Sequence, residues 1–329
     1  LAELAGGDAR FDVAVRGADD AQGARVTAIC DLIPRKAEAL AQQYEIPRAY
    51  SLYRDMLEQE SFDAVFVLVE PANLYHVVWH ALEADVPVFM EKPPGVTAYQ
   101  AHSLARQAEK RQRILQVGFN RRHIPLVRRV REIVTEAAPI TQVEGCFYKF
   151  GSGAFDRGSL AAYESDTIHA IDLVRWFAGG KPETAAMVTA RHGEPVPNAW
   201  NGVCRFDNGV TGVIKANYRT GGRVHRFEVH GPGVSAYINL GFGKPDCRAE
   251  ILLHKGAAPY SLAARGAGGQ EILQLDGREL ADSDDFHRYY GFYQEDCHFL
   301  DCVRNGTPPE PTIADAAESM TFAEKLRDA

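Results

Sequence analysis

Short apolar runs alternate with amphipathic segments over the first third of the chain. Strands are predicted at residues 25–30, 62–69, 86–90 and 114–117. The second of these runs is apolar almost throughout, which is typical of a strand buried on both faces of a parallel sheet. Helices are predicted at about residues 34–44, 73–84 and 97–111. Regular alternation of strand and helix predicts a doubly wound parallel sheet of the Rossmann type.

The pattern changes after about residue 140, where strand-like segments become longer and more closely spaced. Strands are predicted at residues 141–150, 184–190, 199–206, 210–218, 226–230 and 236–240. The turn Asp207-Asn208-Gly209 is a strong hairpin signal. Helices are predicted at about 165–178 and after Pro311. The predicted fold class is therefore α/β, with an N-terminal Rossmann domain (1–119) and a C-terminal α+β domain (120–329) that has an open, mainly antiparallel sheet.

Composition agrees with a globular protein of two domains. The chain has 329 residues, of which 46% are hydrophobic and 24% charged. No apolar run approaches the roughly 20 residues that span a bilayer, so we expect a soluble, cytoplasmic protein without a membrane partner. The net charge of -8 disfavours nucleic acid as a partner. Six scattered cysteines without C-x-x-C spacing are expected to be free, buried thiols.

One stretch departs from the acidic average and carries five arginines. They are Arg121, Arg122, Arg128, Arg129 and Arg131. Two interpretations remain open at this point. The arginines form a solvated helix face with structural ion pairs, or they form a patch for an anionic substrate or a cofactor phosphate.

Ligands of open parallel sheets bind beyond the carboxyl ends of the strands, so the residues there are candidates. Asp31 follows the first predicted strand and can accept hydrogen bonds from an adenosine ribose, which favours NAD over NADP; its alternative role is a helix cap. After the second strand, Glu70 precedes a predicted turn at Pro71 and Asn73, with His76 one helical turn further on.

The third strand is followed by Glu91-Lys92-Pro93-Pro94-Gly95. Two prolines and a glycine disfavour a helix and hold the preceding side chain rigidly, and Lys92–Pro93 is a candidate cis bond. In the later helix, His169 and Asp172 lie three positions apart on one predicted polar face, while Ile168, Ile171 and Val174 form a separate apolar stripe. A histidine beside a carboxylate suits a general base near neutral pH.

Together these segments resemble the glucose-fructose oxidoreductase, inositol dehydrogenase and rhizopine catabolism (Gfo/Idh/MocA) family, over nearly the whole chain. The resemblance is carried by Asp31, residues 71–76, 81–93, 117–122 with Pro125, 168–173, Phe299-Leu300 and 305–309. It implies an NAD(P)-dependent oxidoreductase that transfers hydride to or from a CH–OH group of a sugar, cyclitol or related polyol. It also implies NAD (or NADP) as cofactor and a homo-oligomer, a dimer or a tetramer.

The resemblance also implies roles for single residues. Lys92 would hydrogen-bond the reacting hydroxyl, and His169 would be the acid/base. The family's acidic residue four before the histidine is replaced by Ser165, so Asp166 is the candidate third catalytic residue. Asn120 and the residues at the strand ends, Asp31, Glu70, Pro71, Asn73, His76, Glu91 and Lys92, are the candidate cofactor-binding residues.

One departure concerns the phosphate loop. A G-x-G-x-x-G loop should precede Asp31, and none does. Residues 11–15 are too close to Asp31 for a loop and a helix between them, and residues 1–4 are interpreted as the end of the first helix. We therefore expect the first strand and its glycine loop to lie upstream of this chain.

Two other functions compete with a dehydrogenase. The first is a non-enzymatic or catalytically impaired ligand sensor on the same fold, which the missing loop favours and the presence of Lys92 and His169 opposes. The second is a metal-dependent enzyme, which has little support because His76 and His80 have no third ligand nearby in the sequence. Substrate specificity is expected to lie in loops around 149–163 and 244–265.

Overall fold

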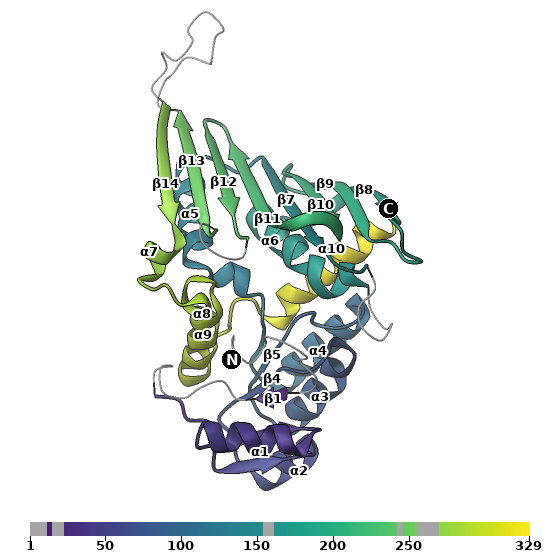
Figure 1. The fold of residues 1–329 in the computed structure, drawn as a ribbon, viewed down its shortest axis with the longest axis vertical. Coiled ribbons are helices and arrows are strands. Elements are labelled where there is room, and N and C mark those ends of the chain that lie inside the picture. The colour runs from purple at the N-terminus through teal and green to yellow at the C-terminus, as the bar shows by residue number, and fades with distance from the viewer. Residues whose placement is uncertain (1–11, 15–22, 154–160, 242–245, 255–269) are drawn as a thin grey trace, which may run out of the picture. The chain divides into compact units, whose positions relative to one another are not determined.

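The computed structural model describes residues 12–14, 23–153, 161–241, 246–254 and 270–329. It divides into two compact units (Figure 1). The first contains Leu1–Asn120 and Phe292–Glu324, and the second contains Arg121–Gly291 and Lys325–Ala329. The expected division at residue 119 did not include the return of the chain to the first unit. The segment Phe292–Glu324 belongs to that unit.

The first unit contains two three-stranded sheets, ordered β1-β2-β3 and β4-β5-β6. The pairs β4–β5 and β5–β6 are parallel, as predicted, and β2 pairs in parallel with β3, a strand that the sequence did not predict. Every residue of β4, β5 and β6 is buried, which explains the uninterrupted apolar runs. The strands are β1 (Asp12–Ala14), β2 (Ala28–Asp31), β3 (Arg48–Tyr50), β4 (Val65–Val67), β5 (Val88–Met90) and β6 (Leu115–Val117).

Helices connect these strands (Figure 1). They are α1 (Pro34–Gln43), α2 (Tyr53–Gln59), α3 (Pro71–Glu83) and α4 (Ala98–Arg111). Thr97 caps the start of α4, because its hydroxyl accepts a hydrogen bond from the backbone N–H of Gln100. A correction concerns Pro71 and Asn73, which do not form a separate turn but belong to the first turn of α3, with Pro71 at its start.

β1 differs from the first strand of a standard Rossmann sheet. It pairs antiparallel with β2, with Val13 opposite Cys30. In a standard Rossmann sheet the first strand runs parallel to the second, and a crossover connection joins the two strands. The expectation that residues 11–15 do not form the usual first strand is consistent with this pairing. The expected helix end at residues 1–4 and most of the expected connection that follows lie outside the described residues.

The return of the chain to the first unit is explained by an aromatic cluster. Phe299 lies on α9 (Phe292–Asn305) and is fully buried against Phe66 and Phe89, with ring centroids 5.2 and 5.7 Å away. Burial of one such ring contributes roughly 1.5–3 kcal/mol. The side-chain amide of Gln116 also donates to the backbone carbonyl of Glu295. The last helix of the chain is α10 (Ile313–Arg327).

The second unit is built on one eight-stranded sheet, ordered β14-β13-β12-β11-β7-β10-β9-β8. Every pair in it is antiparallel except β10–β7, so the predicted mainly antiparallel sheet is confirmed. The strands are β7 (Gln142–Phe150), β8 (Pro182–Ala190), β9 (Ala199–Phe206), β10 (Thr211–Asn217), β11 (Arg219–Gly231), β12 (Val234–Asn239), β13 (Arg248–His254) and β14 (Gln270–Asp276).

The predicted hairpin between β9 and β10 is also confirmed. Asp207-Asn208-Gly209 forms its turn, and Gly209 has a φ of 87°, a conformation that favours glycine. Gly231-Pro232-Gly233, a loose match to the phosphate-loop pattern, is instead the turn between β11 and β12.

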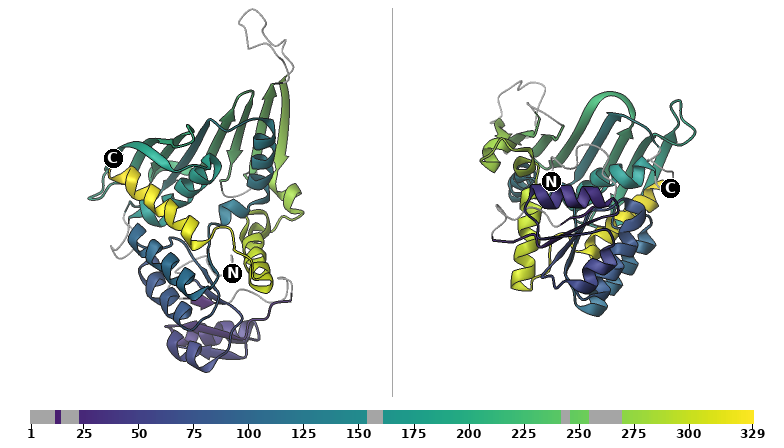
Figure 2. Two further views of the ribbon diagram at one scale, coloured as in Figure 1. Left: turned by 180° about the vertical axis from the view of Figure 1, so that it is seen from behind. Right: turned by 60° about the horizontal axis from the view of Figure 1, so that its bottom comes forward.

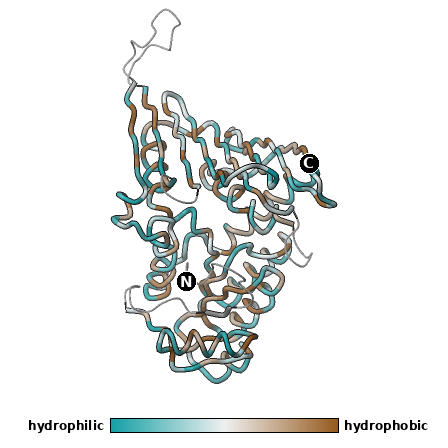
Figure 3. Tube along the Cα trace, viewed as in Figure 1, coloured by the Kyte–Doolittle hydropathy of each residue, from teal (hydrophilic) through white to brown (hydrophobic). Residues whose placement is uncertain are grey.

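Two long helices contact the same sheet. α5 (Pro125–Ala137) packs against β11, β12 and β13, and α6 (Ile168–Ala178) packs against β7 and β10 (Figure 2). The unit also contains the 3-10 helix η1 (Asn120–His123), which begins at the boundary, the π-helical turn η2 (Tyr163–Thr167), α7 (Gly277–Ala281) and α8 (Phe286–Tyr289). Apolar and polar positions alternate along the chain in both units (Figure 3).

Candidate active site

The carboxyl ends of the parallel strands in the first unit carry most of the predicted cofactor-binding residues. Asp31 is the last residue of β2, Glu70 lies between β4 and α3, and Glu91 and Lys92 follow β5 directly. Asn120 follows β6 after two residues and is 3% exposed. His76 is exposed on α3, with its ring edge-on to Tyr75. Five of these six residues therefore follow strands at the sheet edge that binds ligands in open α/β folds.

Asp31 is the best test of whether this edge fits a dinucleotide. It is 1% exposed, and its Oδ1 accepts a hydrogen bond from the backbone N–H of Ile33 at 2.6 Å. Its Oδ2 is buried and has no hydrogen-bond partner among the residues that the structure describes. A buried carboxylate oxygen without a partner is costly unless a ligand supplies donors. The two ribose hydroxyls of an adenosine would do so, and the residues present therefore fit NAD.

Lys92 is held by a loop with several constraints. The Lys92–Pro93 bond is cis, as predicted, and Pro93, Pro94 and Gly95 are buried. The side-chain amide of Gln100 accepts from the backbone N–H of Val96 at 2.9 Å, which joins this loop to α4. A Cβ on Gly95 would lie 2.8 Å from the Cβ of Gln100, so a larger residue would displace the loop. The loop thus fixes the backbone position of Lys92.

The prediction of a polar face on α6 is wrong. His169 is 8% and Asp172 1% exposed, and the helix is buried on nearly all sides. Asp172 receives two hydrogen bonds from the Arg122 guanidinium, at 2.8 and 2.5 Å, and forms with it an ion pair in which both side chains are buried. Asp172, which we expected beside His169 on a polar face, is therefore one partner of a buried ion pair.

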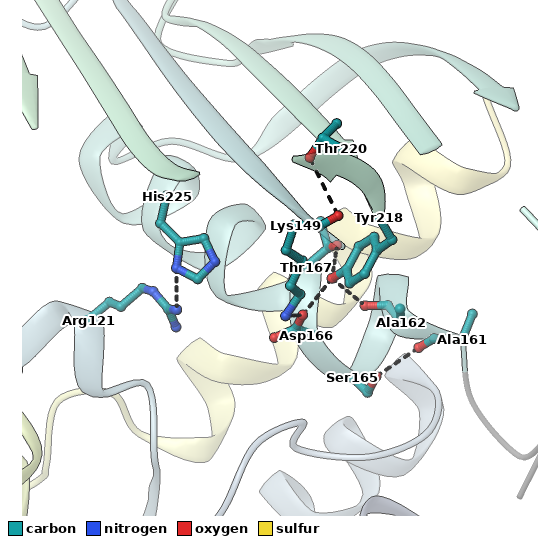
Figure 4. Close-up of polar contacts among 10 residues, drawn as sticks. All are labelled: Arg121, Lys149, Ala161, Ala162, Ser165, Asp166, Thr167, Tyr218, Thr220 and His225. Carbon is teal, nitrogen blue, oxygen red and sulfur yellow. Dashed lines mark hydrogen bonds and ion pairs between the residues drawn. The ribbon is translucent and has the colours of Figure 1, made fainter. Parts of the chain in front are cut away.

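Asp166 lies one turn before His169, in η2, and makes two strong polar contacts (Figure 4). Its carboxylate forms an ion pair with Lys149 on β7 and accepts a hydrogen bond from the Tyr218 hydroxyl at 2.7 Å. Burial and the nearby Asp166 carboxylate raise the pKa of Tyr218 well above its ordinary value, so the phenol stays protonated and donates. Ser165 donates to the Ala161 carbonyl at 3.0 Å.

The arginine-rich stretch is divided in its roles. Arg121 and Arg122 are 4% and 2% exposed, so neither lies on a solvated face, but the expected structural ion pair is present between Arg122 and Asp172. The Arg131 guanidinium lies 4.0 Å from the ring of Trp176 on α6, and the exposed Arg129 pairs with Glu132. The inward position of Arg121 and Arg122 was missed because charged residues are almost never fully buried unless paired.

Lys149 and Tyr218 were also missed as members of the site. A signal was present for Lys149, because it shares the inward face of β7 with Phe147, two positions earlier. Burial lowers the pKa of Lys149, while the Asp166 carboxylate opposes this shift. Parts of the loops expected to determine specificity, 154–160, 242–245 and 255–269, lie outside the described residues.

Two further expectations concern metals and thiols. The described residues contain no group of three or more His, Cys, Asp or Glu side chains that could hold a metal ion. The imidazole of His80 instead contacts the Tyr53 hydroxyl at 2.8 Å. All six cysteines are free, and all except Cys146 are buried. Within the described residues, no helix has the length and apolar character needed to cross a bilayer.

Parallel strands connected by helices, with Asp31 at the end of β2 and Lys92 shortly after β5, define the first unit as a Rossmann-type domain. Comparison with known proteins gives the family. Residues 7–119 match the NAD-binding Rossmann domain of the Gfo/Idh/MocA oxidoreductases, and residues 165–236 match a C-terminal domain of the same family. The chain belongs to this family.

Individual relatives are distant. The chain is 28% identical over 166 residues to an inositol 2-dehydrogenase of Salmonella paratyphi B, a match that covers 49% of each chain, so it spans about half the length of that relative. It is 25% identical to the rhizopine catabolism protein MocA of Rhizobium meliloti, covering 98% of this chain and 92% of the relative. The structure of myo-inositol 2-dehydrogenase from Lactobacillus plantarum aligns with a TM-score of 0.72 at 22% identity, covering 94% of this chain and 91% of that one.

Proposed function

We propose that this protein transfers hydride between NAD and a CH–OH group of a sugar, cyclitol or related polyol. The observation that carries the proposal is Oδ2 of Asp31 at the end of β2, which is buried and has no hydrogen-bond partner among the described residues, in a chain whose family has an NAD-binding Rossmann domain. Polyol substrates are supported by relatives named as inositol dehydrogenases. The Asp31 carboxylate suits NAD better than NADP, because it would repel the 2′-phosphate of NADP.

Three side chains have proposed roles in the reaction. Lys92 donates a hydrogen bond to the substrate hydroxyl and so stabilises negative charge that develops on its oxygen. His169 accepts the hydroxyl proton while the bound nicotinamide accepts the hydride from the same carbon. Asp166, which is paired with Lys149 and bound by the Tyr218 hydroxyl, lies one helical turn before His169 and orients the helix that carries it. The other cofactor contacts are proposed for Glu70, Pro71, Asn73, His76, Glu91 and Asn120.

A spectrophotometric assay of NADH formation at 340 nm, with a panel of polyols that includes myo-inositol, tests the proposal. Lys92→Gln and His169→Gln should each lower kcat by a factor of roughly 100 or more. NADH binding, followed by nicotinamide fluorescence, should survive in His169→Gln. Lys110→Gln, on the surface of α4, is the control. Failure to oxidise any polyol, or unchanged turnover in both variants, would refute the proposal. Polyol binding without turnover would favour the sensor alternative.

We further propose a homo-oligomer in a reducing, cytoplasmic setting. The outward face of the sheet exposes Val188, Val203 and Ile272, which are 72%, 48% and 54% exposed on β8, β9 and β14. Apolar side chains exposed in this way support association with a second copy of the chain. The free cysteines support a reducing environment. Light scattering of wild type and Val203→Lys tests the assembly, and a wild-type monomer at micromolar concentration would contradict it.

A further inference from the structure

A block of four side chains on the helix-covered face of the second unit's sheet has an unusual charge arrangement. The register of β7 and β11 places Lys149 opposite Arg223 and Phe147 opposite His225. Because side chains two positions apart share a face, all four lie on the same side of the sheet. Two cations directly opposite each other destabilise a strand pair. The pairing of Lys149 with Arg223 is therefore not explained by sheet stability.

A third cation, Arg121, joins this block. Its Nη2 lies 3.3 Å from Nδ1 of His225 (Figure 4). Its guanidinium lies 5.2 Å from the ring centre of Phe147. The Lys149 ammonium lies 5.3 Å from the centre of the same ring. Arg121, Lys149 and Arg223 are called the cation cluster below.

Arg121 is buried beside neutral groups. It is 4% exposed, and among the described residues its polar side-chain contacts are with the His225 imidazole and the Tyr290 hydroxyl, not with a carboxylate. Its Nε is buried without a hydrogen-bond partner among those residues. Removing a guanidinium from water without an opposite charge is strongly unfavourable. An anion supplied from outside the chain would satisfy both the charge and the free donor.

His225 adds a donor rather than a charge to the cluster. Burial, followed by the charges of Arg121, Arg223 and Lys149, lowers the pKa of His225 far below its ordinary value. The imidazole is therefore neutral. Because a guanidinium can only donate, Nδ1 of His225 accepts from Arg121 and its proton resides on Nε2. The Tyr290 hydroxyl also contacts Arg121, and it donates its proton to the Leu240 carbonyl at 2.6 Å.

Asp166 balances part of this charge. Its carboxylate is paired with Lys149 and bound by the Tyr218 hydroxyl. The Asp166 charge acts on both Lys149 and Arg223. Lys149 and Asp166 are 18% and 21% exposed at the side chain, and Arg223 is exposed, so solute molecules can reach the edge of the cluster.

We propose that the cation cluster binds an oxyanion group of the substrate, so that the preferred polyol is a sugar acid or a sugar phosphate rather than a neutral sugar. Guanidinium groups match the geometry of carboxylates and phosphates through paired N–H donors. The inference rests on the proposed polyol oxidation, because it concerns the substrate of that reaction. It adds Arg121 and Arg223 as specificity-determining residues in the unit that carries His169.

Isothermal titration calorimetry of the full chain with D-glucuronate, D-glucose 6-phosphate and D-glucose tests the inference. At least one anionic probe should bind tenfold or more tightly than D-glucose, and its advantage should shrink as salt is added. The tighter of the two anions identifies carboxylate or phosphate as the group recognised. Equal affinities for all three probes, or no binding of either anion, would overturn the inference.

Variants locate the binding. Arg121→Gln and Arg223→Gln should each lower the affinity for the anionic probe by roughly tenfold or more. The affinity for D-glucose should change much less. Arg223 is exposed, so its variant remains informative if Arg121→Gln does not fold. The matched control is Arg226→Gln, on the same strand but on the opposite face and 53% exposed. An equal loss in Arg226→Gln would overturn the assignment to the cluster.

The assay of NADH formation separates this inference from the proposed function. Oxidation of neutral polyols by a protein in which the anionic probes have no advantage overturns the inference and leaves the function intact. Anion binding that depends on Arg121 and Arg223, without NADH formation from any polyol, supports the cluster as an anion site and refutes the proposed oxidation.

Discussion

The buried ion pair between Arg122 and Asp172 permits a quantitative prediction about the second unit. Their side chains are 2% and 1% exposed, and two hydrogen bonds join them. Asp172→Asn preserves the shape of the side chain but leaves the guanidinium without its counter-charge. Loss of one partner of a buried pair costs about 3–5 kcal/mol. The free energy of unfolding should fall by that amount.

Urea unfolding followed by tryptophan fluorescence measures this loss. Trp176 and Trp200 lie in the second unit, and Trp176 is on the same helix as Asp172. Glu183→Gln is the control, because its pair with Arg205 has a similar N–O distance of 2.9 Å but is 60% and 48% exposed. Exposed pairs contribute about 0.2–1 kcal/mol. The reasoning is refuted if Asp172→Asn loses no more stability than Glu183→Gln.

A double variant sharpens the same prediction. Arg122→Met combined with Asp172→Leu removes both charges and keeps apolar volume. The double variant should be more stable than Asp172→Asn, and within about 1 kcal/mol of wild type or above it. Additive losses would mean that the two residues act through separate contacts, contrary to the pairing seen in the structure.

Three further outcomes follow from the structure. Asp31→Ala should weaken NADH binding roughly tenfold by fluorescence titration while the exposed Asp55→Ala does not, and equal affinities would contradict the ribose contact. The lowered pKa of His225 means that the unfolded chain binds a proton below pH 6.5 that the folded chain does not. The free energy of unfolding should therefore fall by about 1 kcal/mol more between pH 7 and pH 5.5 in wild type than in His225→Gln, and equal pH slopes would exclude this linkage. Gly209→Ala, at a φ of 87° with open space around its Cα, should cost about 1 kcal/mol in the same assay, and an unchanged midpoint would show that the turn adapts.

Much of the fold could be predicted where local pattern and tertiary burial agree. The runs that became β4, β5 and β6 are apolar because both sides of these strands are buried. β3 was missed because Arg48 and Ala49 are exposed and leave no apolar signal. β13 did carry a signal, since Ala249 and Ile251 are buried at alternate positions, but this segment was interpreted as part of a loop. The return of α9 depends on Phe299, whose partners lie far away in the sequence.

The site was predictable at the strand ends and much less so in the second unit. Topology alone places Asp31, Glu91 and Lys92 at one edge of parallel strands. Nothing local shows that Arg121 and Arg122 are buried, because that depends on the elements that pack around them. Adjacent arginines also face different partners, a carboxylate for Arg122 and an imidazole for Arg121.

The contacts around α6 bear on the proposed acid/base role of His169 in a helix that is buried on nearly all sides. His169 lies three residues after Asp166 and three before Asp172. Asp166 is fixed by Lys149 and Tyr218, and Asp172 is fixed by Arg122. The helix is thereby held by ionic contacts on both sides of the histidine, in addition to its apolar packing. A residue that must accept a proton in one geometry benefits from such support, because small displacements of a reacting group are costly in rate. Asp172→Asn should therefore lower kcat as well as stability, although Asp172 itself is paired with Arg122 and has no proposed part in the proton transfer.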